Sequence, residues 1–321
     1  MRNSRTLWSN RRRSGAKPFE TLRILLIGGT GFIGSAIAKH LEGLKGSQCV
    51  AIGSEECDLS DYNATLDVVG SHTRRSVVVF AAGIPRHKMN DLETMKSNIT
   101  MVSNVIEACN RARPKKVIFL SSVEVYGVPE ELPITEDSEI NPNRLYAIGK
   151  VTAEYMWRKW AYENNRSLAI LRLPGVYGVG CGGMLGHLFE CIRKNKTFRL
   201  INGGRELRDF LYVDDIARVV CELSRIEFAV VRLNMATGQS TMVADIVEQV
   251  FSIFGNRCRI EEGKSNNFER PHQSLVGKTP GRLCHLTFDI SRLRNLLPAL
   301  AMTPLNDGLI LCKLQIANCE G

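Results

Sequence analysis

A glycine-rich segment, GGTGFIG at residues 28–34, directly follows an apolar run and opens a stretch with helical spacing. Gly28 permits a tight turn, Gly31 lets the backbone approach a pyrophosphate, and Gly34 lets the helix sit close to the preceding strand. The helix N-terminus then presents free N–H groups and a partial positive charge to phosphate. The segment predicts a strand, a turn and a helix that hold NAD or NADP; a purely structural glycine turn is the alternative.

Short apolar runs alternate with longer helical stretches from residue 21 to about residue 175. The pattern predicts strands at Leu22–Gly28, Gln48–Gly53, Ser76–Ala81, Lys116–Ser121 and Leu168–Leu173. It predicts helices near 33–43, 61–70, 92–112 and 144–164. Apolar strands separated by helices are typical of parallel sheets covered on both faces. We therefore expect an α/β fold, a doubly wound parallel sheet of the Rossmann type, over residues 21–175.

Glycine and loop-forming residues become more frequent beyond residue 175. Helices are expected near 183–194, 214–224, 242–254 and 289–297. A chain of 321 residues has room for a second unit. We expect residues 176–321 to form a smaller, irregular C-terminal substrate domain that crosses back to the sheet.

Positive charge is concentrated at the N-terminus. Residues 1–20 carry six arginine or lysine residues against one glutamate, which accounts for +5 of the net charge of +9. Little excess charge is left for the rest of the chain, so nucleic acid is not the expected partner. The segment lacks the apolar stretch of a secretory signal. It is expected to be a basic flexible arm or the product of a start codon placed too early, although a transit peptide has a similar composition.

The chain shows no sign of a membrane span, a disulfide framework or a metal site. No uninterrupted apolar run reaches the ~18 residues that a membrane helix needs. The ten cysteines are scattered, none forms a CxxC pair, and no Cys/His cluster has zinc spacing. Scattered thiols are typical of small buried side chains in a reducing cytosol, so we expect a cytoplasmic protein.

The second predicted strand ends without the acidic residue that commonly holds the adenine ribose of NAD. Gly53 stands at that position, and no arginine follows directly to bind a 2′-phosphate. The choice between NAD and NADP therefore stays open. Asp58, followed by Leu59, either places a carboxylate near the adenine amino group or caps the next helix.

Tyr146 and Lys150 lie four residues apart in a predicted helix, so both side chains project from one face. An ammonium group beside a phenol favours the phenolate, and a positive nicotinamide ring acts in the same direction. We therefore expect the pKa of Tyr146 to be lowered towards neutrality. Ser122 ends the preceding strand, at the sheet edge where ligands bind, and is placed to hydrogen-bond the same substrate oxygen. An ordinary pair on a solvated helix is the alternative for Tyr146 and Lys150.

Six segments stand in a recurring order. They are GGTGFIG at 28–34, AAG at 81–83, SSVEVYG at 121–127, YAIGK at 146–150, RLPGVYG at 172–178 and RDFLYVDD at 208–215. In this order the chain resembles the extended short-chain dehydrogenase/reductase family, the NAD-dependent epimerases and dehydratases of nucleotide sugars. The resemblance spans roughly residues 22–310 and implies a Rossmann domain followed by a nucleotide-sugar-binding domain.

The resemblance also implies roles for single residues. Ser122, Tyr146 and Lys150 look like the catalytic triad, in which Lys150 also holds the nicotinamide ribose. Arg208 looks like the arginine that grips the sugar-nucleotide diphosphate, a task that suits a bidentate guanidinium. Asn98 resembles a position that supports the active-site helix and loops, with a surface asparagine as the alternative. The residues expected to bind the cofactor are Gly28, Gly31, Phe32, Ile33, Gly34, Asp58, Leu59, Ala81, Tyr146 and Lys150.

One departure from the family pattern concerns proton transfer. Val123 and Glu124 stand where dehydratases carry an Asp–Glu pair. Val123 has no proton to donate, which argues against dehydration, whereas Glu124 keeps the option of a base. Cys181 and His187 resemble, loosely, the extra pair of double epimerases, with a small core cysteine and a surface histidine as the default.

A second departure concerns the diphosphate. The family's second diphosphate arginine falls on Thr279, between Lys278 and Arg282, so that position does not carry over. The acidic pair at 214–215 is expected to cap the following helix.

Three functions remain open. The leading hypothesis is an NAD(P)-dependent nucleotide-sugar epimerase that acts at C4 through a transient keto intermediate in glycan precursor biosynthesis. The first alternative is an NADPH-dependent reductase or epimerase/reductase of a 4-keto-6-deoxy nucleotide sugar, similar to GDP-fucose synthase. The second is a cofactor-binding regulator or an RNA-associated protein. The resemblance also implies a homodimer and a role in surface or secreted glycans, including nodulation-type signals.

Overall fold

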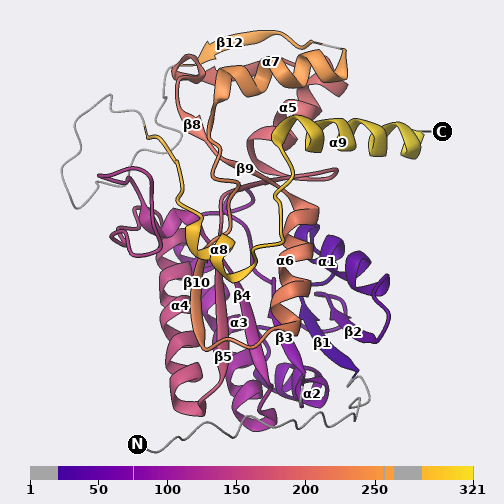
Figure 1. Ribbon diagram of the computed structural model, residues 1–321, viewed down its shortest axis with the longest axis vertical. Coiled ribbons are helices and arrows are strands. Elements are labelled where there is room, and N and C mark those ends of the chain that lie inside the picture. Colours follow the sequence, from indigo (N-terminus) through magenta and orange to yellow (C-terminus); the bar gives the residue numbers. More distant parts are fainter. Residues whose placement is uncertain (1–20, 75, 256, 264–283, 321) are drawn as a thin grey trace, which may run out of the picture.

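A six-stranded parallel sheet forms the centre of the computed structural model, which describes residues 21–74, 76–255, 257–263 and 284–320 (Figure 1). Its strands are β1 (Leu22–Ile27), β2 (Ser47–Ile52), β3 (Val77–Phe80), β4 (Lys116–Ser122), β5 (Ser167–Leu173) and β10 (Val230–Asn234), in the order β10-β5-β4-β3-β1-β2. All neighbouring strands run parallel. The predicted doubly wound α/β sheet is confirmed, and each of the five predicted strands is present. The predicted arm, residues 1–20, lies outside the described residues.

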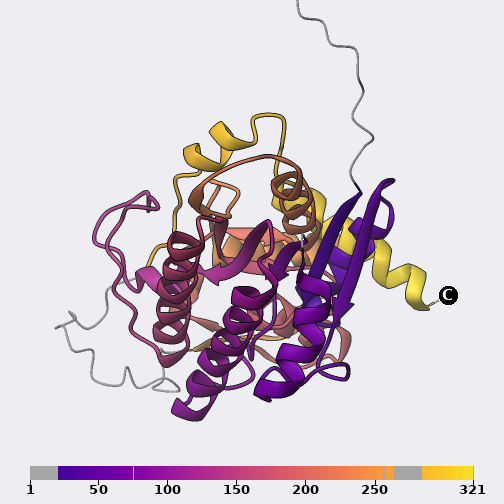
Figure 2. The same ribbon diagram turned by 90° about the horizontal axis from the view of Figure 1, so that it is seen from below.

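Helices cover both faces of this sheet (Figure 2). On one face lie α1 (Phe32–Glu42) and α6 (Val213–Arg225); on the other lie α2 (Tyr62–Thr73), α3 (Leu92–Ala112) and α4 (Leu145–Asn164). Strand β1 shows the pattern behind this: Ile24 and Leu26 pack on the first face, Leu25 and Ile27 on the second. Because successive strand side chains alternate, a strand with helices on both sides must be apolar throughout.

A second unit of short elements lies beyond the carboxyl ends of the sheet strands (Figure 1). A separate apolar core with Leu188, Phe198, Val250 and Leu309 holds it together. Its helices are α5 (Gly183–Arg193), α7 (Val243–Phe254) and α9 (Leu305–Glu320). Its paired strands are β6 (Gly175–Tyr177) with β9 (Phe210–Tyr212), β7 (Phe198–Ile201) with β12 (Ile260–Gly263), and β8 (Leu207–Arg208) with β11 (Thr241–Met242).

The C-terminal half also returns to the central sheet. Helix α6 packs on its face, β10 pairs with β5 at its edge, and α8 (Ser291–Leu296) joins the same core through Leu293. The two remaining short elements are the 3-10 turns η1 (Val123–Tyr126), after β4, and η2 (Asn202–Gly204). Strand β10, the short strands and α9 were not predicted.

Three general properties follow from the described residues. None of the helices in this part of the chain is long and apolar enough to cross a membrane. The nine cysteines whose side chains are described are free thiols. Within the same residues, no group of three or more His, Cys, Asp or Glu side chains is placed to hold a metal ion.

Candidate active site

The glycine-rich turn after β1 is closed by contacts that exclude side chains. Gly28 has φ +89°, and a Cβ there would lie 2.6 Å from the amide nitrogen of Ala82. A Cβ on Gly34 would lie 2.0 Å from the carbonyl oxygen of Gly28. The turn is anchored to the end of β2, because the Gly28 amide donates to Ile52 O at 2.7 Å. Gly28 therefore forms the tight turn, and Gly34 the close approach of helix to strand, that the sequence predicts.

The N-terminus of α1 suits the pyrophosphate of a dinucleotide. Its cap, Gly31, is extended and offers no side-chain acceptor to the first-turn amides. The next two side chains, Phe32 and Ile33, pack into the core of the second unit. The helix thus presents backbone N–H groups and its positive end without an acidic side chain in the first turn, which fits an anionic group.

The end of β2 explains the missing acidic residue. A Cβ on Gly53 would lie 2.3 Å from Thr30 Oγ1. Thr30, in the glycine-rich turn, therefore occupies the space that an acidic side chain at residue 53 would need. A carboxylate is nevertheless present, because Glu56 Oε2 accepts a hydrogen bond from the Gly53 amide at 2.7 Å. Sequence reasoning missed Glu56, although an acidic residue three positions after Gly53 was the available signal. It is a candidate for binding the adenine ribose.

Asp58 does not cap a helix. Its Oδ1 accepts hydrogen bonds from the amide and the hydroxyl of Ser60 at 2.9 and 2.7 Å, and these bonds hold the pKa of its carboxyl below the usual value. Helix α2 is capped by Asp61, which accepts from the Ala64 amide at 2.9 Å. The helix-cap interpretation of Asp58 is therefore wrong, and its exposed carboxylate keeps the adenine-binding prediction open.

The three residues of the predicted triad come from two neighbouring elements. Lys150, on α4, donates to the Leu120 carbonyl of β4 at 2.8 Å, and its Nζ lies 5.8 Å from the centre of the Tyr146 ring. Ser122, 8% exposed, ends β4 two residues later. Its Oγ accepts from the Glu124 amide at 3.2 Å, which leaves the hydroxyl hydrogen available to a ligand.

The protein's own groups shift the pKa of Tyr146 in the direction opposite to the prediction. Burial and the negative charge of Glu124 raise the pKa of Tyr146, and Arg86 opposes them in part. Burial also lowers the pKa of Lys150 to about 8, with Glu154 opposing. For the protein's own groups the prediction is therefore wrong, because Lys150 directs its Nζ to a β4 carbonyl and burial is the largest influence on the phenol. The effect of a positive nicotinamide ring stays a prediction.

The loop between β3 and α3 fastens the catalytic helix. Asn98 accepts a hydrogen bond from the Ile84 amide at 2.8 Å and donates to the Ile84 carbonyl at 3.1 Å. This geometry favours the supporting role over a surface asparagine. Asn90 accepts from the Tyr146 amide at 3.0 Å, in the first turn of α4. Sequence reasoning missed Asn90, because a loop asparagine far from any motif gives no signal.

Glu124 is engaged by a second residue of this loop. Arg86 Nε lies 2.7 Å from Glu124 Oε1, while Glu124 Oε2 is buried and has no hydrogen-bond partner among the described residues. Both charges act on Tyr146. Whether Glu124 acts as a base stays a prediction.

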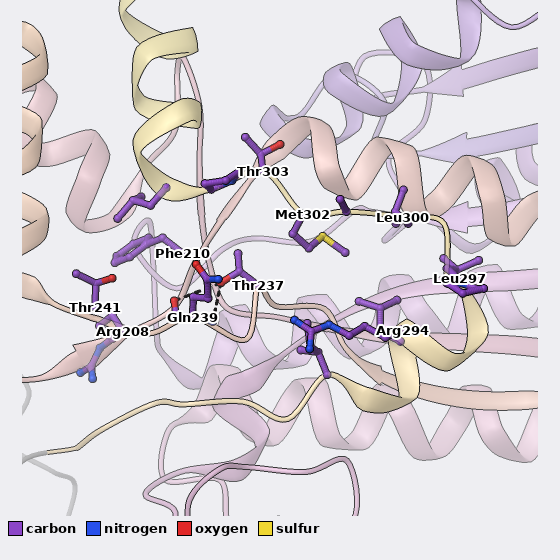
Figure 3. A pocket seen from close by; sticks show the side chains of 16 residues that line it. Arg208, Phe210, Thr237, Gln239, Thr241, Arg294, Leu297, Leu300, Met302 and Thr303 are labelled. Carbon is purple, nitrogen blue, oxygen red and sulfur yellow. Dashed lines mark hydrogen bonds between the residues drawn. The ribbon is translucent and has the colours of Figure 1, made fainter.

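Arg208 lies at the other end of the site, on β8. Its guanidinium contacts the Glu206 carboxylate and the Cys284 carbonyl. The residue also borders a cavity of about 530 Å³ that includes Thr237, Gln239 and Arg294 but none of the predicted triad. Figure 3 shows the Arg294 guanidinium directed towards Thr237 and Gln239, whereas that of Arg208 points away from them. The diphosphate role of Arg208 stays a prediction.

The remaining candidates are dispersed. Cys181 packs against the core of the second unit, and His187 is exposed on α5 beside Cys191 and the Phe198 ring. Their role in catalysis stays a prediction. Lys278, Thr279 and Arg282 lie outside the described residues.

The acidic pair at 214–215 lies inside the first turn of α6, whose cap is Tyr212, so the predicted cap is wrong. The buried Asp215 instead accepts from the amide and the hydroxyl of Thr303 at 2.8 and 2.6 Å. It therefore ties α6 to the segment that leads into α9.

Comparison with known proteins agrees with this geometry. A model of the NAD dependent epimerase/dehydratase family matches residues 24–227. A putative UDP-glucose 4-epimerase of Methanocaldococcus jannaschii is 26% identical over 255 residues, which cover 73% of this chain and 83% of the relative. GDP-L-fucose synthase of Escherichia coli is 22% identical over 266 residues, which cover 74% and 83%. The structure of UDP-glucose 4-epimerase from Thermotoga maritima with UDP-glucose matches with a TM-score of 0.77 at 20% identity, covering 94% of this chain and 100% of that one. At that identity the structural match establishes the fold.

Proposed function

Because this chain belongs to the NAD dependent epimerase/dehydratase family, we propose that it inverts a nucleotide sugar at C4 through a transient keto sugar. The family assignment gives the cofactor, NAD, and the general class of reaction. The relatives named UDP-glucose 4-epimerase support the choice of C4, and the Thermotoga maritima protein with UDP-glucose supports a nucleotide sugar as the substrate.

The residues of the first domain fit NAD. The glycine turn brings the backbone close to the start of α1, and the N-terminus of that helix supplies amides and positive potential for the pyrophosphate. We expect Glu56 and Asp58 to bind the adenosine half, and Lys150 to bind the nicotinamide ribose. The chemistry that bound NAD would supply is the reversible acceptance of a hydride from the sugar carbon.

Proton movement falls to the side chains at the end of β4 and on α4. Tyr146, as phenolate, takes the proton of the C4 hydroxyl while that carbon loses its hydride, and returns the proton when the keto sugar is reduced on its other face. Ser122 donates its hydroxyl hydrogen to the same sugar oxygen. The positive nicotinamide ring of bound NAD and the nearby ammonium group of Lys150 would both favour the phenolate, and would so oppose the effect of burial on the pKa of Tyr146.

One observation carries the proposal: the Lys150 ammonium lies 5.8 Å from the Tyr146 ring, beside the strand end that holds Ser122. A regulator that only binds a cofactor has no need for this set. Val123 argues against a dehydratase, because it is apolar and buried at the position where that reaction needs an acid.

The test is to incubate the purified protein with NAD and a panel of UDP-, GDP- and dTDP-sugars, with and without NADPH, and to identify new sugars by NMR. An epimerase forms a C4 epimer without net consumption of the cofactor. Stoichiometric oxidation of NADPH would instead assign a reductase. Absence of turnover in a folded, NAD-binding protein would contradict both enzymes.

A further inference from the structure

A buried ion pair lies under the catalytic helix. Glu154, on α4, is 5% exposed and Arg172, on β5, is 1% exposed. Arg172 holds the carboxylate with two hydrogen bonds, Nη2 to Oε2 at 2.7 Å and Nε to Oε1 at 3.1 Å. Removing two charges from water costs free energy that their attraction often fails to recover, so a buried ion pair is weak evidence for stability. Its position points to a role in the chemistry.

Glu154 lies one helical turn after Lys150. The two residues are four apart on α4 and project from the same face of the helix. Lys150 Nζ donates to the carbonyl of Leu120, and Glu154 Oε1 accepts from the hydroxyl of Ser121 at 2.5 Å. The two side chains therefore form hydrogen bonds with consecutive residues of one strand, β4. Because Ser121 and Arg172 already bond the carboxylate, Glu154 acts on Lys150 through its charge.

We propose that Glu154 is a positioning residue that keeps Lys150 in its ammonium form, with Arg172 and Ser121 fixing the orientation of the carboxylate. The inference rests on the proposed function only in assigning Lys150 to the support of Tyr146. An amine taken out of water tends to lose its proton, and a nearby carboxylate counteracts this. Burial lowers the pKa of Lys150, and the charge of Glu154 is the opposing influence.

The surrounding charges leave this role to Glu154. Near the start of α4, Glu124 is paired with Arg86, and burial raises the pKa of Tyr146, so the resting phenol brings no negative charge to Lys150. On β5, Arg172 is a buried cation that is paired with Glu154. Without Glu154, Arg172 would lose its carboxylate partner, and Lys150 would lose the negative charge that opposes the effect of burial.

Arg172 is itself fixed from further away. Its Nη1 donates to the hydroxyl of Tyr126 at 2.9 Å and to the carbonyl of Glu136 at 3.2 Å. Tyr126 in turn donates to Asn234 Oδ1, on β10, at 2.6 Å. The buried Glu136 directs Oε1 to the Asn234 amide at 2.8 Å, and its carboxylate is therefore engaged at β10. Strand β10, which comes from the C-terminal half, thus helps to hold Arg172 and, through it, the carboxylate of Glu154.

The experiment measures the protonation of Lys150 without using catalysis. The full chain is treated with acetic anhydride over a range of pH, and acetylation of Lys150 is followed by mass spectrometry, because only the neutral amine reacts. In Glu154→Gln, the midpoint of the reactivity curve is expected to fall by about one pH unit or more. Glu163→Gln is the matched control, because Glu163 lies on the same helix, is exposed and pairs with Lys159. It is expected to leave the midpoint unchanged.

Two further variants separate charge from packing. Ser121→Ala removes a hydrogen bond but no charge, and is expected to keep the wild-type midpoint. If Glu154→Gln does not fold, the double variant Glu154→Gln/Arg172→Met removes both buried charges and is still expected to lower the midpoint. A Lys150 midpoint equal to that of the wild type in a folded Glu154 variant would overturn the proposal. Since acetylation needs no sugar, a failed epimerase assay would leave this result standing.

Discussion

Arg86 and Glu124 form an ion pair, with Nε 2.7 Å from Oε1, that joins the loop after β3 to the turn after β4, next to Tyr146. The two charges act on the phenol in opposite directions: Glu124 raises its pKa and Arg86 lowers it. The pair therefore sets the balance between phenol and phenolate in the resting site.

Glu124→Gln is expected to lower the pKa of Tyr146, because it removes a negative charge that disfavours the phenolate. Since the phenolate is the active base, the rise of kcat/KM with pH moves to lower pH, by about one pH unit. Arg86→Met removes a positive charge that favours the phenolate, so the rise of kcat/KM is expected to move to higher pH. The pH–rate profiles of the two variants check these shifts, with a substitution of the exposed Glu131, Glu131→Gln, as the control. Identical profiles for all four proteins would refute the electrostatic role of the pair.

Gly34→Ala is expected to damage the cofactor site. Its Cβ would lie 2.0 Å from the Gly28 carbonyl oxygen, so the glycine turn or α1 must shift, at a cost of at least about 2 kcal/mol of unfolding free energy. NAD affinity should fall with it. Gly70→Ala, where a Cβ meets nothing within 4 Å on α2, should instead stabilise by about 0.5–1 kcal/mol. Denaturant unfolding measures the change in stability, and calorimetric titration with NAD measures the change in affinity. Equal stability and equal NAD affinity of the two variants would contradict the expected damage at Gly34.

Asn90→Ala is expected to loosen the start of the catalytic helix. It removes the acceptor of the Tyr146 amide, a contact comparable to a helix cap and worth about 1 kcal/mol. Both the melting temperature and kcat should decrease. Asn90→Asp keeps an acceptor oxygen and should preserve most of both. A kcat unaffected by the alanine would show that this contact does not position Tyr146.

Glu56 is expected to favour NAD over NADP. Its carboxylate is held at the end of β2, where a 2′-phosphate would meet a negative charge. Glu56→Gln should therefore lower the ratio of the dissociation constant for NADP to that for NAD, mainly because the variant binds NADP more tightly. Fluorescence titration of the wild type and the variant with NADH and NADPH gives the four dissociation constants. An unchanged ratio would show that Glu56 does not determine the choice between NAD and NADP.

The predictable parts of the molecule are those with strong periodicity. Strands such as β4 are apolar on both faces and are separated by long helices, so their positions follow from the pattern. The triad was found because Ser122, Tyr146 and Lys150 stand in short, ordered motifs. Strand β10 was missed because Arg232 and Asn234 interrupt its apolar run and it follows a helix from the irregular half. Helix α9 was missed because its place depends on tertiary packing.

Contacts made by loops could not be predicted in the same way. Arg86 meets Glu124 only because the β3–α3 loop folds back across the sheet edge, which no spacing rule indicates. The pKa of Tyr146 was predicted in the wrong direction for a related reason. Burial depends on the whole enclosure of the phenol, whereas the sequence reveals only its helical neighbour Lys150.

The most direct test of the central claim follows the hydrogen at C4. A nucleotide sugar that this protein converts is labelled with deuterium at C4 and incubated with the NAD-loaded protein in ordinary water. If Tyr146 moves only the hydroxyl proton while the C4 hydrogen leaves and returns as hydride, the epimerised product retains its deuterium, and Tyr146→Phe lowers the rate by about 10²–10⁴-fold. Loss of the deuterium to solvent, or full activity in Tyr146→Phe, would contradict the account.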